Sequence, residues 1–251
     1  MRMKPSLKHL KKTCAACERS GIEMNKEHVF PEWLILKTNT NNTGIRWMEN
    51  RKLPALRATL PLCCECNGIF GKELEGPVSK LFNDIESNRG ISDMEAERLI
   101  RWLWKIDGLG WCAANPNHKY TTTYTLRERV LRPIDSIRDN LVLAVSLIKA
   151  LHSESDDWPM GIDSKTSGDA VFVSGVFSKI AIMVLLDPFV SLLPPNFSYY
   201  HLASKRDASS EAKLFYPKVG FVDDVEAVGF TYLASIPIAK AHDDFWIEMN
   251  K

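Results

Sequence analysis

The sequence lacks any apolar run of the roughly 18 to 20 residues needed to cross a bilayer, and its first dozen residues lack the apolar core of a signal peptide. It also lacks internal repeats and low-complexity segments. With 45% hydrophobic and 25% charged residues, its composition is not that of a disordered chain. These absences exclude membrane-spanning, secreted and repeat classes, and they predict a globular cytoplasmic protein.

A strong overall charge is absent too, because the formal net charge is +1. The charge is unevenly distributed, however. Residues 1–76 hold 13 Lys/Arg against 8 Asp/Glu, whereas residues 77–251 hold 19 against 23. Much of the N-terminal excess lies in Arg2, Lys4, Lys8, Lys11 and Lys12. A basic arm of this kind attracts polyanions such as nucleic acid, although a solvated chain terminus can have the same composition.

The cysteines are not distributed as a disulfide framework would be, because five of the six come before residue 67. Four of them form two Cys-x-x-Cys pairs, Cys14 with Cys17 and Cys63 with Cys66, separated by 45 residues. Two-residue spacing lets both sulfurs of a pair reach one ion, and four thiolates suit a closed tetrahedral site. The spacing predicts a structural zinc ion and leaves Cys64 outside the site. Free thiols or a redox pair are the alternative.

Glu27 and His28 lie between the two cysteine pairs, Pro31 follows them, and Asn67 comes directly after Cys66. This order of residues resembles the zinc-stapled HNH, or ββα-metal, endonucleases, including phage junction-resolving nucleases whose zinc is held by four cysteines. The resemblance covers about residues 14–75. It implies a ββα-metal fold and metal-dependent hydrolysis of phosphodiester bonds.

The resemblance also implies roles for three residues. Glu27 and Asn67 are the expected ligands of a catalytic divalent cation, and His28 is the expected general base. Oxygen ligands favour a hard ion, Mg²⁺ or Mn²⁺, and histidine titrates near neutral pH, which suits proton abstraction from water. The zinc ion is then purely structural.

The sequence lacks one element of the family pattern, because no histidine follows Asn67 to provide the last ligand. Glu73 or Glu75 can substitute. If the segment after Asn67 is a helix, Glu75 lies about two turns along it and either reaches the cation or orients one of its ligands. Lys72 is either a phosphate contact or a solvated surface lysine.

Gly76 marks the expected boundary between a zinc-stapled module, residues 1–76, and a larger α+β domain with an antiparallel sheet, residues 77–251. Ser92 and Glu95 predict a capping box at a helix start, and Trp102, Trp104 and Trp111 are expected in the core. The pattern predicts helices over residues 77–86, 92–106 and 126–136, and strands over 170–177, 180–186, 213–222 and 226–236. Residues 140–151 form an apolar run that fits a buried helix or a strand.

Two functions follow as hypotheses. The first is a DNA endonuclease, with RNA open as a substrate, in which residues 77–251 recognise the substrate or a partner. The second is a non-catalytic zinc module that binds nucleic acid or protein, in which the missing last histidine reflects a lost active site. A protein partner or a homodimer is compatible with both. The resemblance further implies a role in phage (antiviral) defence or DNA processing.

Overall fold

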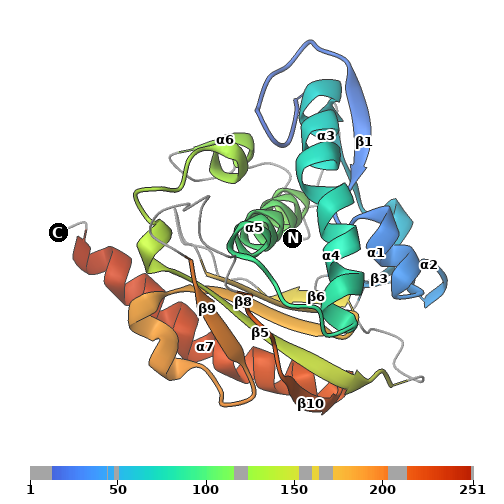
Figure 1. The fold of residues 1–251 in the computed structure, drawn as a ribbon. Coiled ribbons are helices and arrows are strands. Elements are labelled where there is room, and N and C mark those ends of the chain that lie inside the picture. Colours follow the sequence, from blue (N-terminus) through green and yellow to red (C-terminus); the bar gives the residue numbers. More distant parts are fainter. Residues whose placement is uncertain are drawn as a thin grey trace, which may run out of the picture.

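The computed structural model describes residues 13–43, 45–47, 51–115, 124–152, 160–163, 172–202 and 214–249. These residues form an α+β fold, as predicted, with a central sheet between helix α7 on one face and helix α5 on the other (Figure 1). The basic arm, including Arg2 and Lys12, lies outside the described residues. Among the described helices, none combines the length and apolar character needed to span a bilayer.

The helices are short near the N-terminus and long around the sheet. They are α1 (Glu32–Lys37), α2 (Thr40–Thr43), α3 (Cys64–Phe70), α4 (Gly76–Glu86), α5 (Asp93–Ala114), α6 (Leu126–Leu131) and α7 (Asp224–Met249). A π-helical turn, η3 (Gly71–Glu75), joins α3 to α4, and single 3-10 turns are η2 (Ala55–Arg57), η4 (Arg138–Asn140) and η5 (Asp187–Leu192). The strands are β1 (Met24–His28), β2 (Ile45–Trp47), β3 (Arg51–Leu53), β4 (Thr59–Cys63), β5 (Leu141–Ala150), β6 (Met160–Asp163), β7 (Val173–Phe177), β8 (Ile180–Leu186), β9 (Ser198–His201) and β10 (Val219–Asp223).

The large sheet has the order β10-β5-β8-β7-β6, and β9 also pairs with β5. Its pairs are antiparallel except β10 with β5, which is parallel. The apolar run at residues 140–151 is therefore the long strand β5. Alternate residues of β5 point to opposite faces, and both faces are buried: Leu143 and Val145 pack toward α5, whereas Val142 and Ala144 pack toward α7. A strand covered on both faces is apolar throughout, which explains why the sequence of residues 140–151 fitted a buried helix as well as a strand.

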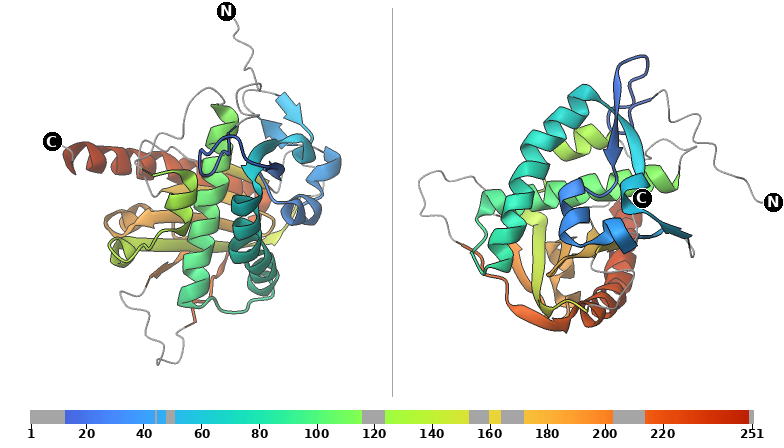
Figure 2. Two further views of the ribbon diagram at one scale, coloured as in Figure 1. Left: turned by 90° about the horizontal axis from the view of Figure 1, so that it is seen from above. Right: turned by 90° about the vertical axis from the view of Figure 1, so that its right-hand side faces the viewer.

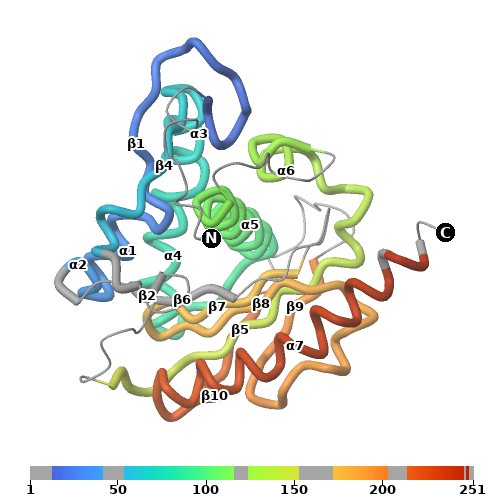
Figure 3. The backbone as a smooth tube through the Cα atoms, turned by 180° about the vertical axis from the view of Figure 1, so that it is seen from behind, coloured from blue at the N-terminus to red at the C-terminus, as the bar shows by residue number. Residues whose placement is uncertain are grey.

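Helices cover both faces of this sheet. Figure 2 (left) shows α4 and α5 side by side over one face, and Figure 3 shows from behind how α7 runs along the opposite face. The predicted capping box is confirmed, since the Ser92 side chain accepts the Glu95 N–H while the Glu95 carboxylate accepts the Ser92 N–H. Trp102 and Trp104 are buried in the core, as expected, and Trp111 packs at its edge.

The prediction of a strand at residues 226–236 is wrong, because this segment belongs to α7. Its β-branched and aromatic residues resemble a strand, but the side chains of Asp223 and Glu226 both accept backbone N–H groups at the start of the helix. The Asp223 carboxylate accepts the Glu226 N–H at 2.8 Å, and Glu226 accepts the Val222 N–H at 2.7 Å. Ala227, Ala234 and Ile238 then bury one helical face against the sheet. The predicted helix at residues 126–136 is shorter than expected, because the extended backbone of Arg132 before Pro133 ends α6 at Leu131.

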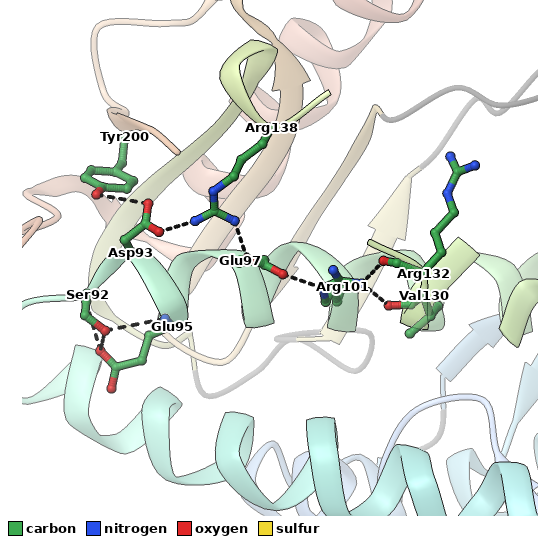
Figure 4. Close-up of polar contacts among 9 residues, drawn as sticks. All are labelled: Ser92, Asp93, Glu95, Glu97, Arg101, Val130, Arg132, Arg138 and Tyr200. Carbon is green, nitrogen blue, oxygen red and sulfur yellow. Dashed lines mark hydrogen bonds and ion pairs between the residues drawn. The ribbon is translucent and has the colours of Figure 1, made fainter. Parts of the chain in front are cut away.

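A buried ion network ties α5 to the start of β5 (Figure 4). The Arg138 guanidinium contacts the carboxylates of Asp93 and Glu97, both on α5. Arg101 donates to Glu97 at 2.8 Å and to the carbonyl oxygens of Val130 and Arg132. Tyr200 Oη on β9 donates to Asp93 at 3.3 Å. Four segments distant in the sequence therefore meet at one end of α5.

The small antiparallel pair β1–β4 leads directly into α3. Helices α3 and α4 and the π turn between them form one helical run from residue 64 to 86, so the expected boundary at Gly76 lies inside a continuous helix. Residues on both sides of Gly76 also share one core cluster, in which the Trp33 ring packs against Phe82 and Trp102. The described residues before Gly76 thus pack against the rest of the fold.

Candidate metal centre and carboxylate cluster

The four predicted cysteines come together. The Sγ atoms of Cys14, Cys17, Cys63 and Cys66 all lie within 4.8 Å of one another, and among the described residues this is the one group of three or more Cys, His, Asp or Glu side chains with such spacing. Cys64 is exposed and outside the group, as predicted.

Local backbone structure presents the sulfurs from two turns. In the first, the Cys14 N–H donates to the Arg19 carbonyl, and Glu18 has a left-handed φ of 57° that turns the chain back. In the second, Cys63 ends β4 and caps α3, and its Sγ accepts the Cys66 N–H at 3.4 Å. The Cys63 N–H in turn donates to Cys14 Sγ at 3.3 Å. Backbone hydrogen bonds, the one from Cys63 among them, help to lower the pKa of the Cys14 thiol.

The donor set fits a tetrahedral zinc ion. With zinc–sulfur distances of about 2.3 Å, the sulfurs of such a site lie about 3.8 Å apart, and Cys17 Sγ lies 3.8 Å from Cys63 Sγ. The hydrogen bond between the Cys14 and Cys66 side chains lowers the pKa of the Cys14 thiol to about 4 and raises the pKa of Cys66. The cluster is therefore suited to bind a metal ion such as zinc, which takes cysteine as thiolate.

Two arginines and a glutamate surround the cysteines. Arg19 Nε donates to Cys17 Sγ at 3.3 Å, and Arg127 at the start of α6 lies 3.8 Å from Cys66 Sγ. Both guanidinium groups also pair with Glu65, and their hydrogen bonds lower the pKa of that carboxyl to about 2, with Arg127 contributing first. Positive charge beside the sulfurs offsets the negative charge that four thiolates carry.

Glu27 and His28 are the last two residues of β1, opposite Leu60 and Thr59 of β4. The chain then turns through buried Val29 and Phe30 into α1, which Pro31 precedes as the N-cap residue. Asn67 lies on α3, one residue past Cys66, and α3 packs beside β1 and β4 (Figure 3). Glu27, His28 and Asn67 are each partly exposed. The oxygen donors of Glu27 and Asn67 are of the kind that Mg²⁺ takes, and they stand on neighbouring elements.

Glu27 and Glu75 meet at a buried lysine that the sequence analysis missed. Lys105 Nζ on α5 lies 2.5 Å from Glu27 Oε1 and 2.5 Å from Glu75 Oε1. The Lys105 side chain is 0% exposed. Burial disfavours its charge, but the carboxylates of Glu75 and Glu27 outweigh this and raise the pKa of Lys105 above its ordinary value. The indole N–H groups of Trp33 and Trp102 donate to Glu75 Oε2 at 2.8 and 3.4 Å.

The π turn helps to place Glu75. Eight residues of regular α-helix would put Glu75 about 80° around the axis from Asn67. The turn at Gly71–Glu75 is wider than an α turn and reduces this rotation. Glu75 therefore lies closer to the side of the helix that carries Asn67 than a regular helix would allow.

A signal for Lys105 was present in the sequence. Lys105 follows Trp102 by three residues and precedes Leu109 by four, so it belongs to the buried stripe of α5. A charged residue on an apolar stripe requires a buried partner. The partners, Glu27 and Glu75, are 78 and 30 residues away, and no local sequence pattern identifies them.

Comparison with protein-family models, with curated proteins and with solved structures found no match.

Proposed function

We propose that the chain is a metal-dependent HNH-type endonuclease that hydrolyses phosphodiester bonds in DNA. The observation that carries the proposal is the ββα arrangement around the cysteine cluster. Strand β1 ends in Glu27 and His28, β4 ends in Cys63, and α3 carries Asn67 directly after Cys66. The cysteine cluster fastens the turn that precedes β1 to the start of α3, which would support the elements that carry the three candidate residues.

The proposed roles follow from side-chain chemistry. Glu27 and Asn67 would hold the divalent cation, Mg²⁺ or Mn²⁺, and the zinc ion in the cysteine cluster would be structural. Once bound, the cation supplies charge neutralisation at the scissile phosphate. His28 at the end of β1 accepts the proton of the attacking water. Asn67 follows Cys66 on α3, and its amide oxygen would be the second ligand of that cation.

One observation favours the rival function, a non-catalytic zinc module. Lys105 already neutralises part of the Glu27 charge, and a side chain held by a resident ammonium ion can be purely structural. In that case the cysteine cluster would support a surface that binds nucleic acid or protein without cleaving it.

The two functions are separated by incubating the purified protein with supercoiled plasmid and Mg²⁺ or Mn²⁺, and by following nicked and linear products. We expect metal-dependent nicking that EDTA abolishes. A double variant, Glu27→Ala with Asn67→Ala, purified in the same way, reports any contaminating nuclease. Plasmid binding without cleavage would reject the nuclease in favour of the binding module. Equal cleavage by the double variant would assign the nicking to a contaminant and reject the proposed site. Labelled DNA and RNA assayed in parallel identify the substrate class.

A further inference from the structure

The Glu75 carboxylate is engaged by three hydrogen-bond donors. Its Oε1 accepts from Lys105, and its Oε2 accepts from the indole groups of Trp33 and Trp102. A carboxylate offers about four lone-pair sites, so three donors leave little capacity for a metal ion. The indole groups come from α1 and α5, whereas Glu75 ends the π turn. These contacts hold the Glu75 side chain between α1, the π turn and α5.

Glu27 is held at one oxygen. Its Oε1 pairs with Lys105 at 2.5 Å, and within the described residues its Oε2 has no hydrogen-bond or ion-pair partner. Lys105 itself has no exposed surface, so it does not touch a substrate. Its ammonium group also lies 5.8 Å from the centre of the Phe70 ring on α3. Lys105 therefore contacts Glu27 from the buried side and links it to α3, the π turn and α5.

We propose that Lys105 is a positioning residue, anchored by Glu75, that restricts Glu27 to one free oxygen and so makes the cation site selective for a small octahedral ion. This inference rests on the proposed function, because it concerns the cation held by Glu27 and Asn67. It assigns Glu75 to the support of that site and removes it from the ligands.

The selectivity follows from ligand geometry. Mg²⁺ demands near-ideal octahedral coordination, whereas Ca²⁺ takes six to eight oxygens and accepts carboxylates in bidentate mode. A glutamate whose Oε1 accepts from an ammonium group presents Oε2 as its unengaged oxygen, and an ion bound in bidentate mode would have to share Oε1 with that ammonium group. Freeing Glu27 from Lys105 would let both oxygens bind and would favour the larger ion.

The test is Mn²⁺ binding to the full chain, measured by electron paramagnetic resonance of free Mn²⁺, with Mg²⁺ and Ca²⁺ as competitors. The variants are Glu27→Gln, Glu75→Gln and Lys105→Met. Lys240→Met is the matched control, because Lys240 is an exposed lysine on α7 that pairs with Asp244. Circular dichroism confirms folding. If Lys105→Met does not fold, the double variant Lys105→Met with Glu75→Gln replaces it, since it keeps the net charge of the cluster.

We expect Glu27→Gln to weaken Mn²⁺ binding at least tenfold and Glu75→Gln to change it less than threefold. Lys105→Met should shift the preference between Ca²⁺ and Mg²⁺ at least fivefold toward Ca²⁺, and Lys240→Met should change neither quantity. A merely structural lysine would not change this ratio, which is independent of the folded fraction. Equal losses in Glu27→Gln and Glu75→Gln, or an unchanged ion preference in Lys105→Met, overturn the inference. Absence of Mn²⁺ binding by the wild type is a different result, because it rejects the proposed metal site itself.

Discussion

Lys105 on α5 forms a 2.5 Å ion pair with Glu27 on β1, although 78 residues separate them in the sequence. Because of this ion pair, the position of the Glu27 side chain at the end of β1 depends on α5. Both carboxylate partners of Lys105 precede Gly76, so this buried charge joins described residues on either side of the expected boundary, which also share one core cluster.

Replacing Lys105 by Met should lower the free energy of unfolding by about 3 kcal/mol or more, because it leaves the carboxylates of Glu27 and Glu75 facing each other with little solvent. Urea denaturation measures the change. The double variant with Glu75→Gln should recover part of the loss. A Lys105→Met protein as stable as the wild type would contradict a charged cluster at this junction.

Replacing Arg138 by Met should cost about 3 to 5 kcal/mol, because the carboxylates of Asp93 and Glu97 then lose a buried partner (Figure 4). Arg89→Met is the matched control. Arg89 also pairs with two carboxylates, but its side chain is 44% exposed, so its loss should change stability by about 1 kcal/mol or less. Similar losses in both variants would show that burial does not set the strength of the Arg138 network.

Metal analysis of the purified protein should find about one zinc ion per chain. Cys14→Ser should lose the metal, and Cys64→Ser should retain it, because Cys64 lies outside the cluster. Chelation should lower the melting temperature of the wild type and of Cys64→Ser alike. Zinc retained by Cys14→Ser would place the ion elsewhere.

Acid should destabilise the fold through His242, which is buried between the rings of Phe172 and Phe189 on the α7 side of the sheet. Burial lowers the pKa of His242 from 6.5 to about 4, and the opposing effect of Asp243 is smaller. The unfolded chain therefore binds more protons between these values. The stabilisation is complete above about pH 6.5 and is lost as the pH falls toward 4, by about 3 kcal/mol.

The check is a pair of urea titrations at several pH values, on the wild type and on His242→Phe. The stability advantage of the wild type should shrink between pH 6.5 and 4. A constant difference across this range would mean that His242 does not titrate as its burial requires.

The sequence predicted those features that depend on short spacing. Two-residue cysteine gaps were enough to select Cys63 over Cys64, and the Ser92–Glu95 spacing was enough to place the start of α5. Features that depend on tertiary packing were missed. For residues 226–236, the β-branched and aromatic composition predicted a strand although Asp223 caps a helix there. Lys105 meets its partners only when β1, η3 and α5 pack together. The roles of Glu27, His28 and Asn67 remain predictions.

The central claim is tested most directly by the single-turnover rate of DNA cleavage in His28→Ala at saturating Mg²⁺. His201→Ala is the matched control, because His201 on β9 is exposed and pairs with Asp187. General-base catalysis contributes about 10² to 10⁴ in rate, so we predict a loss of at least about 100-fold in His28→Ala, with Mn²⁺ affinity unchanged and full activity in His201→Ala. Equal cleavage rates in the wild type and His28→Ala would contradict the account.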